Sequence, residues 1–415
     1  MPVRARRLPS YALFAALLSA AGLPVYIHAP KFYVDEYGVS LAALGAVLFG
    51  LRLLDVVQDP LLGRLSERMR RHRGAAVAIG AFVMAAAMLG LFAVPPPILP
   101  IAWFGIMLTL VFSGFSFLTI CFYAQGVSKA DSLPGRGHLA LARWRETGAL
   151  LGVCVASVAP VGLGVVMGAP FAGYATGFAV LALASVLAMS GEWRDAGLPP
   201  STGFATILRD PVARQLLLIA LFNAAPVAVT STLFLFYVEI ALEAAGWEGP
   251  LLLLFFLSAA GAAPCWGLLA ERFGGRRVLL AAMALGIVAF AGALFLGPGD
   301  VAVFAVICIA SGAVLGADLT LLPAMFATRM ARVSPSAAEG FGLWSFVSKF
   351  TLAFAAIALL PLLEGAGLRT GDAPSPPQAT RLLIIFYAGV PCALKLIAIG
   401  LLSRMNAIED ISWKQ

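Results

Sequence analysis

One stretch of the chain combines ionisable side chains with a spacing that suits ion binding. Arg52, Asp55, Asp59 and Pro60 lie within an otherwise apolar run from residue 40 to residue 65. At about 100° per residue, positions 52, 55 and 59 fall within roughly a 60° arc, so a helix presents them on one face. An uncompensated charge inside a membrane costs at least about 2.5–3.5 kcal/mol on insertion scales. The pattern therefore predicts a cation site with Asp55 and Asp59 as ligands; an Arg52–Asp55 pair that joins neighbouring helices is the structural alternative.

The composition indicates whether this stretch lies in water or in a membrane. The 415 residues are 61% hydrophobic and 12% charged, and the mean hydropathy is +0.95. A soluble domain is about 45–50% apolar and about 25% charged. We therefore expect an all-α integral membrane protein. Its five cysteines lie in apolar segments without paired spacing and its three histidines are scattered, so neither a disulfide nor a further metal site is predicted.

Twelve segments have the length and apolar character of a membrane-spanning helix, which needs about 20 residues. The first follows Arg4, Arg6 and Arg7 and is interpreted as an uncleaved span, because its apolar run continues through Tyr26 and Ile27, beyond the core of a secretory signal. The twelve segments are 10–33, 40–65, 75–94, 99–124, 139–164, 170–190, 213–242, 249–270, 278–296, 301–326, 341–364 and 381–403.

The loops between these spans differ in charge from one side to the other. On the side of the amino terminus they carry Arg64, Arg68, Arg70, Arg71, Arg73, Lys129, Arg136, Arg194, Arg209, Arg272, Arg276, Arg277, Arg329 and Arg332. The opposite side has only Lys31, Arg369 and Arg381 among several acidic residues. Basic loops stay in the cytoplasm. We expect a multi-pass protein of a bacterial inner (plasma) membrane with both termini cytoplasmic, and the charge of +7 does not indicate a nucleic-acid partner.

A polar connection and an internal repeat divide the chain into halves. We predict an N-terminal six-helix bundle over residues 1–190, a cytoplasmic linker over 191–212, and a C-terminal six-helix bundle with a short cytoplasmic tail over 213–415. Five residues recur at an interval of 204 positions, which indicates a duplication. They are Pro60, Gly63, Glu67, Arg68 and Arg73, which match Pro264, Gly267, Glu271, Arg272 and Arg277.

The repeated Gly-x-x-x-Glu-Arg unit occurs at the predicted cytoplasmic end of the second span in each half. Glycine permits close packing of neighbouring helices, and the arginines hold the helix end at an anionic membrane surface. Simple anchoring of the helix end explains one copy. The duplication favours a gate or latch formed by Gly63, Glu67 and Arg68 in one half and by Gly267, Glu271 and Arg272 in the other.

The repeated loops resemble those of the major facilitator superfamily. Within it, Arg52-x-x-Asp55-x-x-x-Asp59-Pro60-x-x-Gly63 resembles the melibiose permease-like glycoside–pentoside–hexuronide:cation symporters. Further matches to that family are Phe32-Tyr33-Val-Asp35-Glu-Tyr-Gly38, Arg143-Trp-Arg145-Glu146, Phe236-Tyr-Val-Glu239 and Gly340-Phe-Gly342-Leu-Trp344-Ser-Phe-Val-Ser-Lys349. The resemblance implies twelve transmembrane helices in two pseudo-symmetric six-helix bundles, which is the major facilitator fold.

The resemblance also implies roles for individual residues. Asp55 and Asp59 correspond to the aspartates that hold the coupling Na⁺ or H⁺, and Gln58 stands where sugar-binding members have asparagine. Ser116 aligns roughly with a helix-four hydroxyl of the cation site. Lys349 corresponds to a membrane lysine on the eleventh span, and we expect Lys349 or Arg52 to compensate the carboxylates when the site is empty.

The substrate pocket departs from the sugar-binding pattern. Sugar-binding members use carboxylates on helices one and four, but this chain has no Asp or Glu between Arg7 and Lys31 or between Pro97 and Lys129. Arg145 and Glu146 form either a substrate-binding pair or a salt bridge at the end of the fifth span. Asp318 either joins a proton path or pairs structurally with Lys349 or Lys395. The candidate substrate-binding residues are Thr119, Tyr123, Arg145, Glu146 and Trp344.

These observations predict a cation-coupled secondary transporter of a small organic solute, such as a sugar or glycoside. We expect a monomer without enzymatic activity or catalytic residues. Its predicted partners are the substrate and the lipid bilayer, and its only predicted ion is the coupling Na⁺ or H⁺. A carrier of lysolipids or other amphipathic lipids on the same fold is one alternative. An intramembrane Mg²⁺-dependent prenyltransferase is another, with Asp55-x-x-x-Asp59 on a diphosphate, but no second Asp-x-x-x-Asp occurs in the chain.

Overall fold

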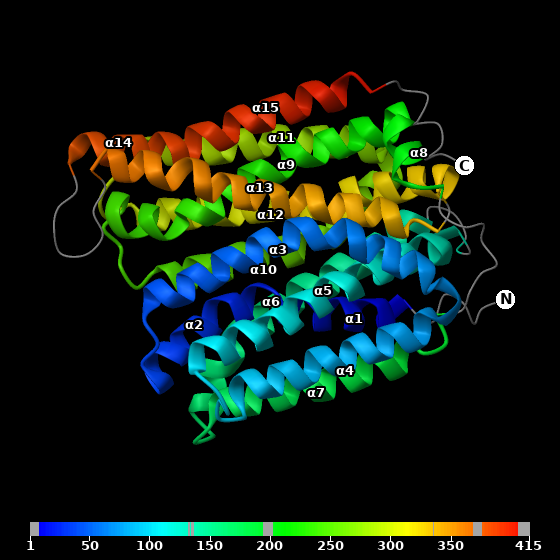
Figure 1. The fold of residues 1–415 in the computed structure, drawn as a ribbon. Helices are drawn as coiled ribbons and strands as arrows, with labels where there is room; N and C mark the ends of the chain where they lie inside the picture. Colours follow the sequence, from blue (N-terminus) through cyan, green and yellow to red (C-terminus); the bar gives the residue numbers. More distant parts are fainter. Residues whose placement is uncertain are drawn as a thin grey trace. The chain divides into compact units, whose positions relative to one another are not determined.

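The computed structural model describes residues 8–131, 133, 137–193, 202–334, 336–367 and 376–405. The regular elements in these ranges are helices (Figure 1). Several parts of the sequence prediction lie outside the described residues: the basic N-terminus, positions 194–201 of the linker, the tail from residue 406, and the loop residues Arg136, Arg369 and Asp372.

The helices of the first half coincide with the first six predicted spans. They are α1 (Leu8–Ala20) and α2 (Leu23–Tyr37), which together cover the first span, then α3 (Leu41–Arg68), α4 (Arg73–Phe92), α5 (Pro100–Asp131), α6 (Gly137–Gly164) and α7 (Pro170–Met189). The short helix α8 (Phe204–Arg209) follows. The second half contains α9 (Pro211–Phe236), α10 (Glu248–Phe273), α11 (Gly275–Ala291), α12 (Val301–Val333), α13 (Ala338–Gly365), α14 (Pro377–Ile384) and α15 (Val390–Ser403).

The lengths of these helices match the thickness of a membrane. Among the described residues, nine helical stretches are long and apolar enough to cross a bilayer. The three other predicted spans coincide with α1–α2, α3 and α13. Within the described ranges two spans contain a π-helical turn, Tyr237–Ala241 after α9 and Ile385–Gly389 between α14 and α15. These turns bring Tyr237 and Tyr387 into a stack with ring centroids 4.0 Å apart.

The helices pack into two compact units. One unit consists of the described residues of Met1–Ile207 and Ala327–Phe346, and the other of those of Leu208–Phe326 and Val347–Gln415. The first turns of α13 therefore belong to the first unit. The predicted bounds of the two bundles and the linker stay a prediction.

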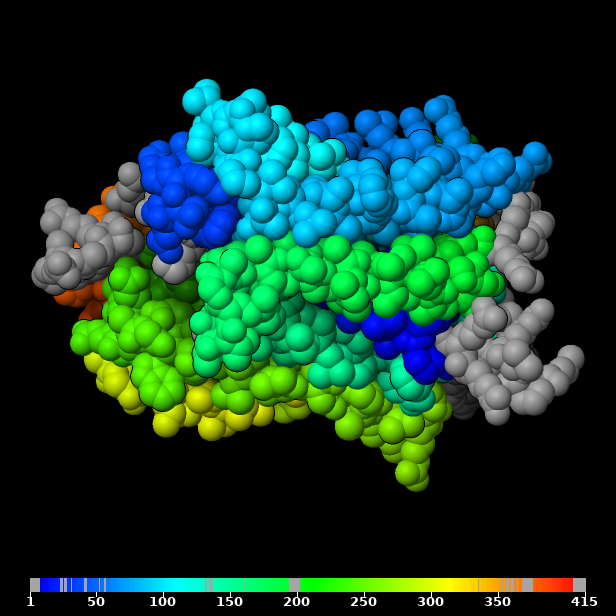
Figure 2. Space-filling model, turned by 90° about the horizontal axis from the view of Figure 1, so that it is seen from below, coloured from blue at the N-terminus to red at the C-terminus, as the bar shows by residue number. Residues whose placement is uncertain are grey.

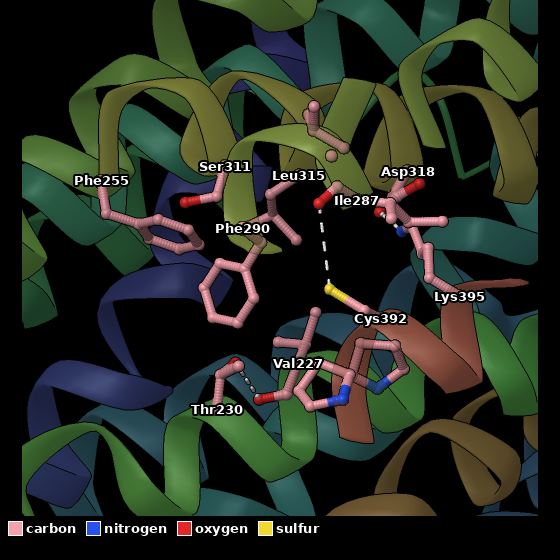
Figure 3. A pocket seen from close by; sticks show the side chains of 14 residues that line it. Val227, Thr230, Phe255, Ile287, Phe290, Ser311, Leu315, Asp318, Cys392 and Lys395 are labelled. Carbon is pink, nitrogen blue, oxygen red and sulfur yellow. Dashed lines mark hydrogen bonds and ion pairs between the residues drawn. The ribbon is translucent and has the colours of Figure 1, made fainter. Parts of the chain in front are cut away.

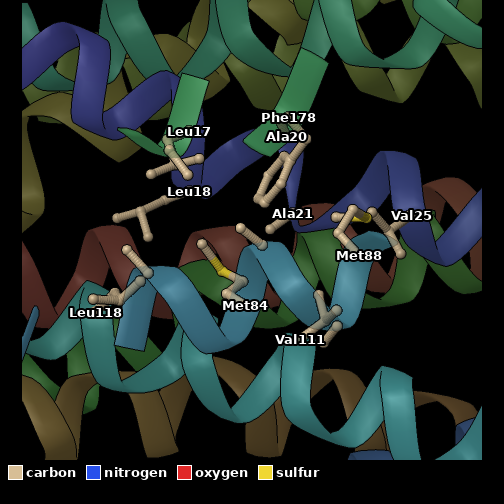
Figure 4. Close-up of a cluster of buried hydrophobic side chains, with 14 of the residues drawn as sticks. Leu17, Leu18, Ala20, Ala21, Val25, Met84, Met88, Val111, Leu118 and Phe178 are labelled. Atoms are coloured by element: carbon tan, nitrogen blue, oxygen red, sulfur yellow. The ribbon is translucent and has the colours of Figure 1, made fainter. Parts of the chain in front are cut away.

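Small residues allow the helices of the first unit to approach closely. A Cβ atom added to Gly152 of α6 would lie 2.6 Å from the Cα of Ala16 in α1, so only glycine permits this contact. Around it, the core is built from side chains of α1, α4, α5 and α7. Figure 4 shows Leu17 and Leu18 of α1 and Met84 of α4 in this cluster.

The outer face of this unit is apolar as well. Figure 2 shows α4 (sky blue) and α7 (teal to green) side by side on the surface. Their outward side chains include Phe82, 73% exposed, and Leu183, 62% exposed. Large exposed apolar surfaces of this kind are rare on soluble proteins, and they face lipid in a membrane protein.

Candidate cation and substrate site

The helix α3 positions the predicted cation ligands. Its first turn is capped by Ser40, whose Oγ accepts a hydrogen bond from the backbone N–H of Ala43 at 3.3 Å. Pro60 lies inside the helix and has no N–H, so the carbonyl of residue 56 lacks its usual intrahelical partner. This places one additional backbone oxygen next to the turn that carries the two aspartates.

Both aspartates are buried, and each accepts a hydrogen bond from a neutral side chain. Asp55 is 5% exposed and Asp59 is 0% exposed. The Nε2 of Gln58 donates to Oδ1 of Asp55 at 2.8 Å. The Oγ of Ser345 in α13 donates to Oδ2 of Asp59 at 2.5 Å. Burying a carboxylate costs free energy unless its oxygens are hydrogen-bonded, and the bonds from these two donors offset part of that cost.

Gln58 also connects α3 to α5. The Oγ of Ser113 donates to Oε1 of Gln58 at 2.9 Å. The extra methylene of glutamine thus lets the amide reach a neighbouring helix while it contacts Asp55. Ser116, the predicted hydroxyl, is buried at 1% exposure, one turn further along the same helix face.

Two glycines bring α3 and the start of α13 into backbone contact. A Cβ on Gly63 would lie 3.2 Å from the carbonyl oxygen of Ala338 and 3.3 Å from the Cα of Gly342. A Cβ on Gly342 would lie 3.1 Å from the carbonyl oxygen of Asp59. Because both positions lack side chains, Ser345 reaches the carboxylate of Asp59. Gly63 thus has a packing role in this unit, and its predicted gate role stays a prediction.

The substrate candidates of α5 and α6 form one cluster. The Nε of Arg145 donates to Oε1 of Glu146 at 2.7 Å, and the hydroxyl of Tyr123 donates to the same oxygen at 3.2 Å. The guanidinium carbon lies 3.8 Å from the centroid of the Tyr123 ring, which is a cation–π contact. The cluster is buried, with Arg145 at 6% and Glu146 at 5% exposure.

Two polar atoms of the predicted substrate-binding residues have no hydrogen-bond partner among the described residues. They are Nη2 of Arg145 and Oγ1 of Thr119, and both are buried. Thr119 and Tyr123 are four residues apart on α5, so they lie on the same helix face. Buried polar atoms are nearly always hydrogen-bonded in native proteins. The Arg145 donor and the Thr119 hydroxyl are therefore suited to bind the oxygens of a ligand.

The other predicted residues are placed as follows. Trp344 is half-buried on α13, within the segment that belongs to the first unit. Lys349 is half-buried in the second unit, and the side chain of Arg52 lies outside the described residues. The predicted coupling roles of Lys349 and Arg52 stay predictions.

The repeated motif has the same local setting in both halves. Pro60 lies inside α3 and Pro264 inside α10. Near the ends of these helices, Gly63 and Gly267 are buried, Glu67 and Glu271 are half-buried, and Arg68 and Arg272 are exposed. Glu67 lies 4.0 Å from Arg70, and the guanidinium of Arg272 lies 5.3 Å from the ring of Phe273. The equivalent positions are consistent with the duplication, and the latch function stays a prediction.

Comparison with known proteins identifies the family. Residues 10–408 match the family described as MFS/sugar transport protein, where MFS is the major facilitator superfamily. The chain belongs to this family. It is a multi-pass membrane transporter and not an enzyme, and the predicted all-α major facilitator fold and family resemblance are confirmed. No curated protein sequence matches the chain.

Solved structures share this fold over the whole chain. A bacterial homologue of the iron transporter ferroportin in the outward-facing state is 16% identical with a TM-score of 0.68, covering 98% of this chain and 99% of that one. The same homologue with soaked iron has a TM-score of 0.66 at 16% identity, covering 100% and 99%. The human organic anion transporter MFSD10 (TETRAN) has a TM-score of 0.65 at 14% identity, covering 97% and 100%. At these identities the likeness shows the fold alone.

Two residues of the site escaped the sequence prediction. Ser113 lies one turn before the predicted Ser116, and Ser345 directly follows the predicted Trp344. Both residues could have been noticed in the sequence because each places a hydroxyl group within an apolar span. Neither partner is evident from the sequence, because Ser345 and Asp59 are separated by 286 positions and Ser113 and Gln58 by 55.

Proposed function

We propose that this protein is a cation-coupled secondary transporter, driven by Na⁺ or H⁺, that moves a small organic solute such as a sugar or glycoside by alternating access. The observation that carries the proposal is the pair of buried carboxylates one helical turn apart on α3, each hydrogen-bonded by a neutral side chain. In this proposal the protein acts as a monomer in a bacterial inner membrane. The basic loops on the side of the amino terminus support the placement of both termini in the cytoplasm.

The neighbours of the two carboxylates can serve both the empty and the loaded site. In the present arrangement the amide nitrogen of Gln58 faces Asp55 and its oxygen faces Ser113. Rotation of the amide by about 180° turns its oxygen toward Asp55, while Ser113 can accept a hydrogen bond as well as donate one. Ser345 has the same dual capacity at Asp59. Hard cations take oxygen ligands, so these rotations convert hydrogen-bond donors into ligands.

Cation binding is coupled to transport through the different affinities of two conformations. Two carboxylates one turn apart repel each other when both are ionised, and a bound cation or proton relieves that repulsion. Because Asp59 is also bonded to Ser345 of α13, a cation at Asp59 changes the contact between α3 and α13. A ligand shifts a conformational equilibrium only by its differential affinity for the two states, and this contact provides such a difference.

The substrate site is proposed at the cluster of Thr119, Tyr123, Arg145 and Glu146. The unpartnered Nη2 of Arg145 donates to a substrate oxygen, and the Thr119 hydroxyl contributes a second polar contact. The same donor supports a second candidate, a lysolipid with a phosphate head group, because guanidinium groups bind phosphate through paired hydrogen bonds. The absence of acidic residues between Arg7 and Lys31 and between Pro97 and Lys129 favours this second candidate over a galactoside.

The test uses purified protein reconstituted in liposomes, with the Na⁺ concentration and pH varied separately. We expect one of these ions to stabilise the wild-type protein thermally and to drive uphill uptake of a member of a sugar and lysolipid panel. Asp55→Asn and Asp59→Asn should abolish both effects, whereas Glu36→Gln, an exposed carboxylate on α2, should retain them. Uphill uptake at the wild-type level in both aspartate variants would refute the proposal.

A further inference from the structure

A second buried ionic site lies in the other unit of the protein. A cavity of about 80 Å³ is lined by residues of α9, α10, α11, α12 and α15 (Figure 3). Its lining is mainly apolar, with Phe255 and Phe290 toward one end. Asp318 of α12 and Lys395 of α15 lie together at the opposite end. All of its lining residues belong to the second unit.

Asp318, Lys395 and Asn223 form a triad across three helices. The ammonium of Lys395 makes a hydrogen-bonded ion pair with Oδ2 of Asp318. It also donates to Oδ1 of Asn223 in α9 at 2.7 Å. The three residues are 6%, 7% and 5% exposed, respectively. Ionisable groups at such depth in a membrane bundle are rare and mark ion or proton pathways more often than packing.

One oxygen of the triad is left for another partner. Oδ1 of Asp318 is buried and accepts no hydrogen bond among the described residues. A buried carboxylate oxygen is normally hydrogen-bonded by protein or by water. A cavity needs only about 10–15 Å³ to hold a water molecule, so this one has room for several. Thr230 and Ser311 line it with hydroxyls that donate to backbone carbonyls and keep lone pairs for water.

We propose that Asp318 and Lys395 form a proton-binding site in the second unit, in addition to Asp55 and Asp59. This inference rests on the proposed transport function and extends it, because it adds a proton to the ions that the transporter binds. A hydronium ion in the cavity transfers its proton to Oδ1 of Asp318, an O–H bond forms, and a water molecule remains. The net charge of the pair changes from zero to +1.

Protonation of Asp318 weakens the electrostatic attraction between α12 and α15. Lys395 loses its counter-charge and keeps only neutral acceptors, Oδ2 of the protonated Asp318 and Oδ1 of Asn223, so the bundle then contains a buried cation without an anionic partner. Other titratable groups do not compensate it within the lining: α15 adds Cys392, whereas α9, α10 and α11 contribute only neutral, non-titratable residues. The protonated state therefore favours a different α12–α15 arrangement in which the lysine reaches water. That preference couples proton binding to conformation.

A purely structural ion pair makes different predictions. Replacing a buried ion pair by apolar or neutral residues of similar size is often without cost to stability. An ion pair with a structural role alone therefore does not need to gain or lose a proton. A proton site must exchange its proton with water over a measurable pH range. The two roles are separated by observing the carboxyl group itself rather than the stability of the fold.

The experiment is pH-dependent infrared difference spectroscopy of the reconstituted, full-length transporter. We expect a protonated-carboxyl band that appears as the pH falls in the wild type and in the Asp55→Asn/Asp59→Asn variant. The band should be lost in Asp318→Asn and in Asp318→Asn/Lys395→Met, which removes both charges and keeps the test valid if the single variant does not fold. An unchanged band in the Asp318 variants, or no Asp318-dependent band in the folded wild type, would overturn the proposal. The proposed cation site at Asp55 and Asp59 is tested independently by cation-driven uptake. If that proposal is wrong, the uptake result shows it, and the Asp318-dependent band is unaffected.

Discussion

Ser345 donates a hydrogen bond to Asp59 across 286 positions of sequence, and this bond joins the start of α13 to the middle of α3. The close approach depends on Gly63 and Gly342, which allow the two backbones to touch. A side chain that a coupling cation is expected to bind is thereby tied to a helix of the other half of the chain. The carboxylate of Asp59 thus takes part both in the expected cation site and in the contact between α3 and α13.

Removal of the Ser345 hydroxyl tests this relationship. Ser345→Ala removes a hydroxyl that donates to Asp59 in the empty site and that can turn its oxygen toward a cation in the loaded site. We expect cation binding to weaken by about tenfold, or about 1.4 kcal/mol, because the loaded site loses an oxygen ligand. The apparent dissociation constant, obtained from thermal stabilisation against Na⁺ or proton concentration, measures the effect.

The matched control is Ser258→Ala, which removes a hydroxyl that bonds within its own helix to the carbonyl of Leu254. It should leave cation affinity unchanged. Unchanged or tighter cation binding in Ser345→Ala would contradict the prediction and would show that the hydroxyl is not a ligand of the loaded site.

Gln58 and Ser113 are expected to act as one unit. Gln58→Leu removes both hydrogen bonds of the amide, and Ser113→Ala removes one of them. A double-mutant cycle on cation affinity should show a coupling energy of about 0.5–3 kcal/mol, as residues in direct contact do. Additive effects of the two substitutions would show that the bridge between α3 and α5 has no role in cation binding.

The contact between Gly63 and α13 should not tolerate a larger side chain. Gly63→Val places its side chain against the backbone of Ala338 and Gly342, and we expect a loss of about 1–3 kcal/mol in stability from overpacking. Cation-dependent stabilisation should weaken as well, because Ser345 is moved from Asp59.

Gly45→Ala on the same helix is the comparison, since a Cβ there meets no atom within 4 Å. That change should be neutral or slightly stabilising, as replacing glycine within a helix usually is. Thermal unfolding of both variants with and without the coupling ion measures the difference. Equal behaviour of the two variants would refute a packing role for Gly63.

Arg145 should affect substrate binding and leave cation binding intact. Arg145→Lys removes the unpartnered Nη2 donor and weakens the contact with the Tyr123 ring. We expect KM to rise at least about tenfold, which corresponds to about 1.4 kcal/mol. The cation-dependent thermal shift should stay at its wild-type size.

The control is Arg71→Lys, which changes an exposed arginine in the short turn between α3 and α4 and should alter neither quantity. If Arg145→Lys abolishes the cation-dependent shift and leaves KM unchanged, the cluster of α5 and α6 belongs to the cation site and not to the substrate site.

Helix positions and helix faces followed directly from the pattern of residues. The twelve apolar segments coincide with helices, because each must satisfy its own backbone hydrogen bonds in a membrane. Asp55 and Asp59 are on one face of α3, as a 3.6-residue period requires. Sequence reasoning left Asp318 with either Lys349 or Lys395 as its partner, and the structure pairs it with Lys395.

The sequence by itself therefore determined which helices form, the family to which the chain belongs and the face that carries the two aspartates. These properties depend on local periodicity, composition and motifs. Only the tertiary structure decided that Gln58 reaches Ser113, that Ser345 reaches Asp59 and that Lys395 faces a cavity with Asp318. Such contacts join residues tens to hundreds of positions apart, and they exist only where helix packing brings the side chains within hydrogen-bond distance.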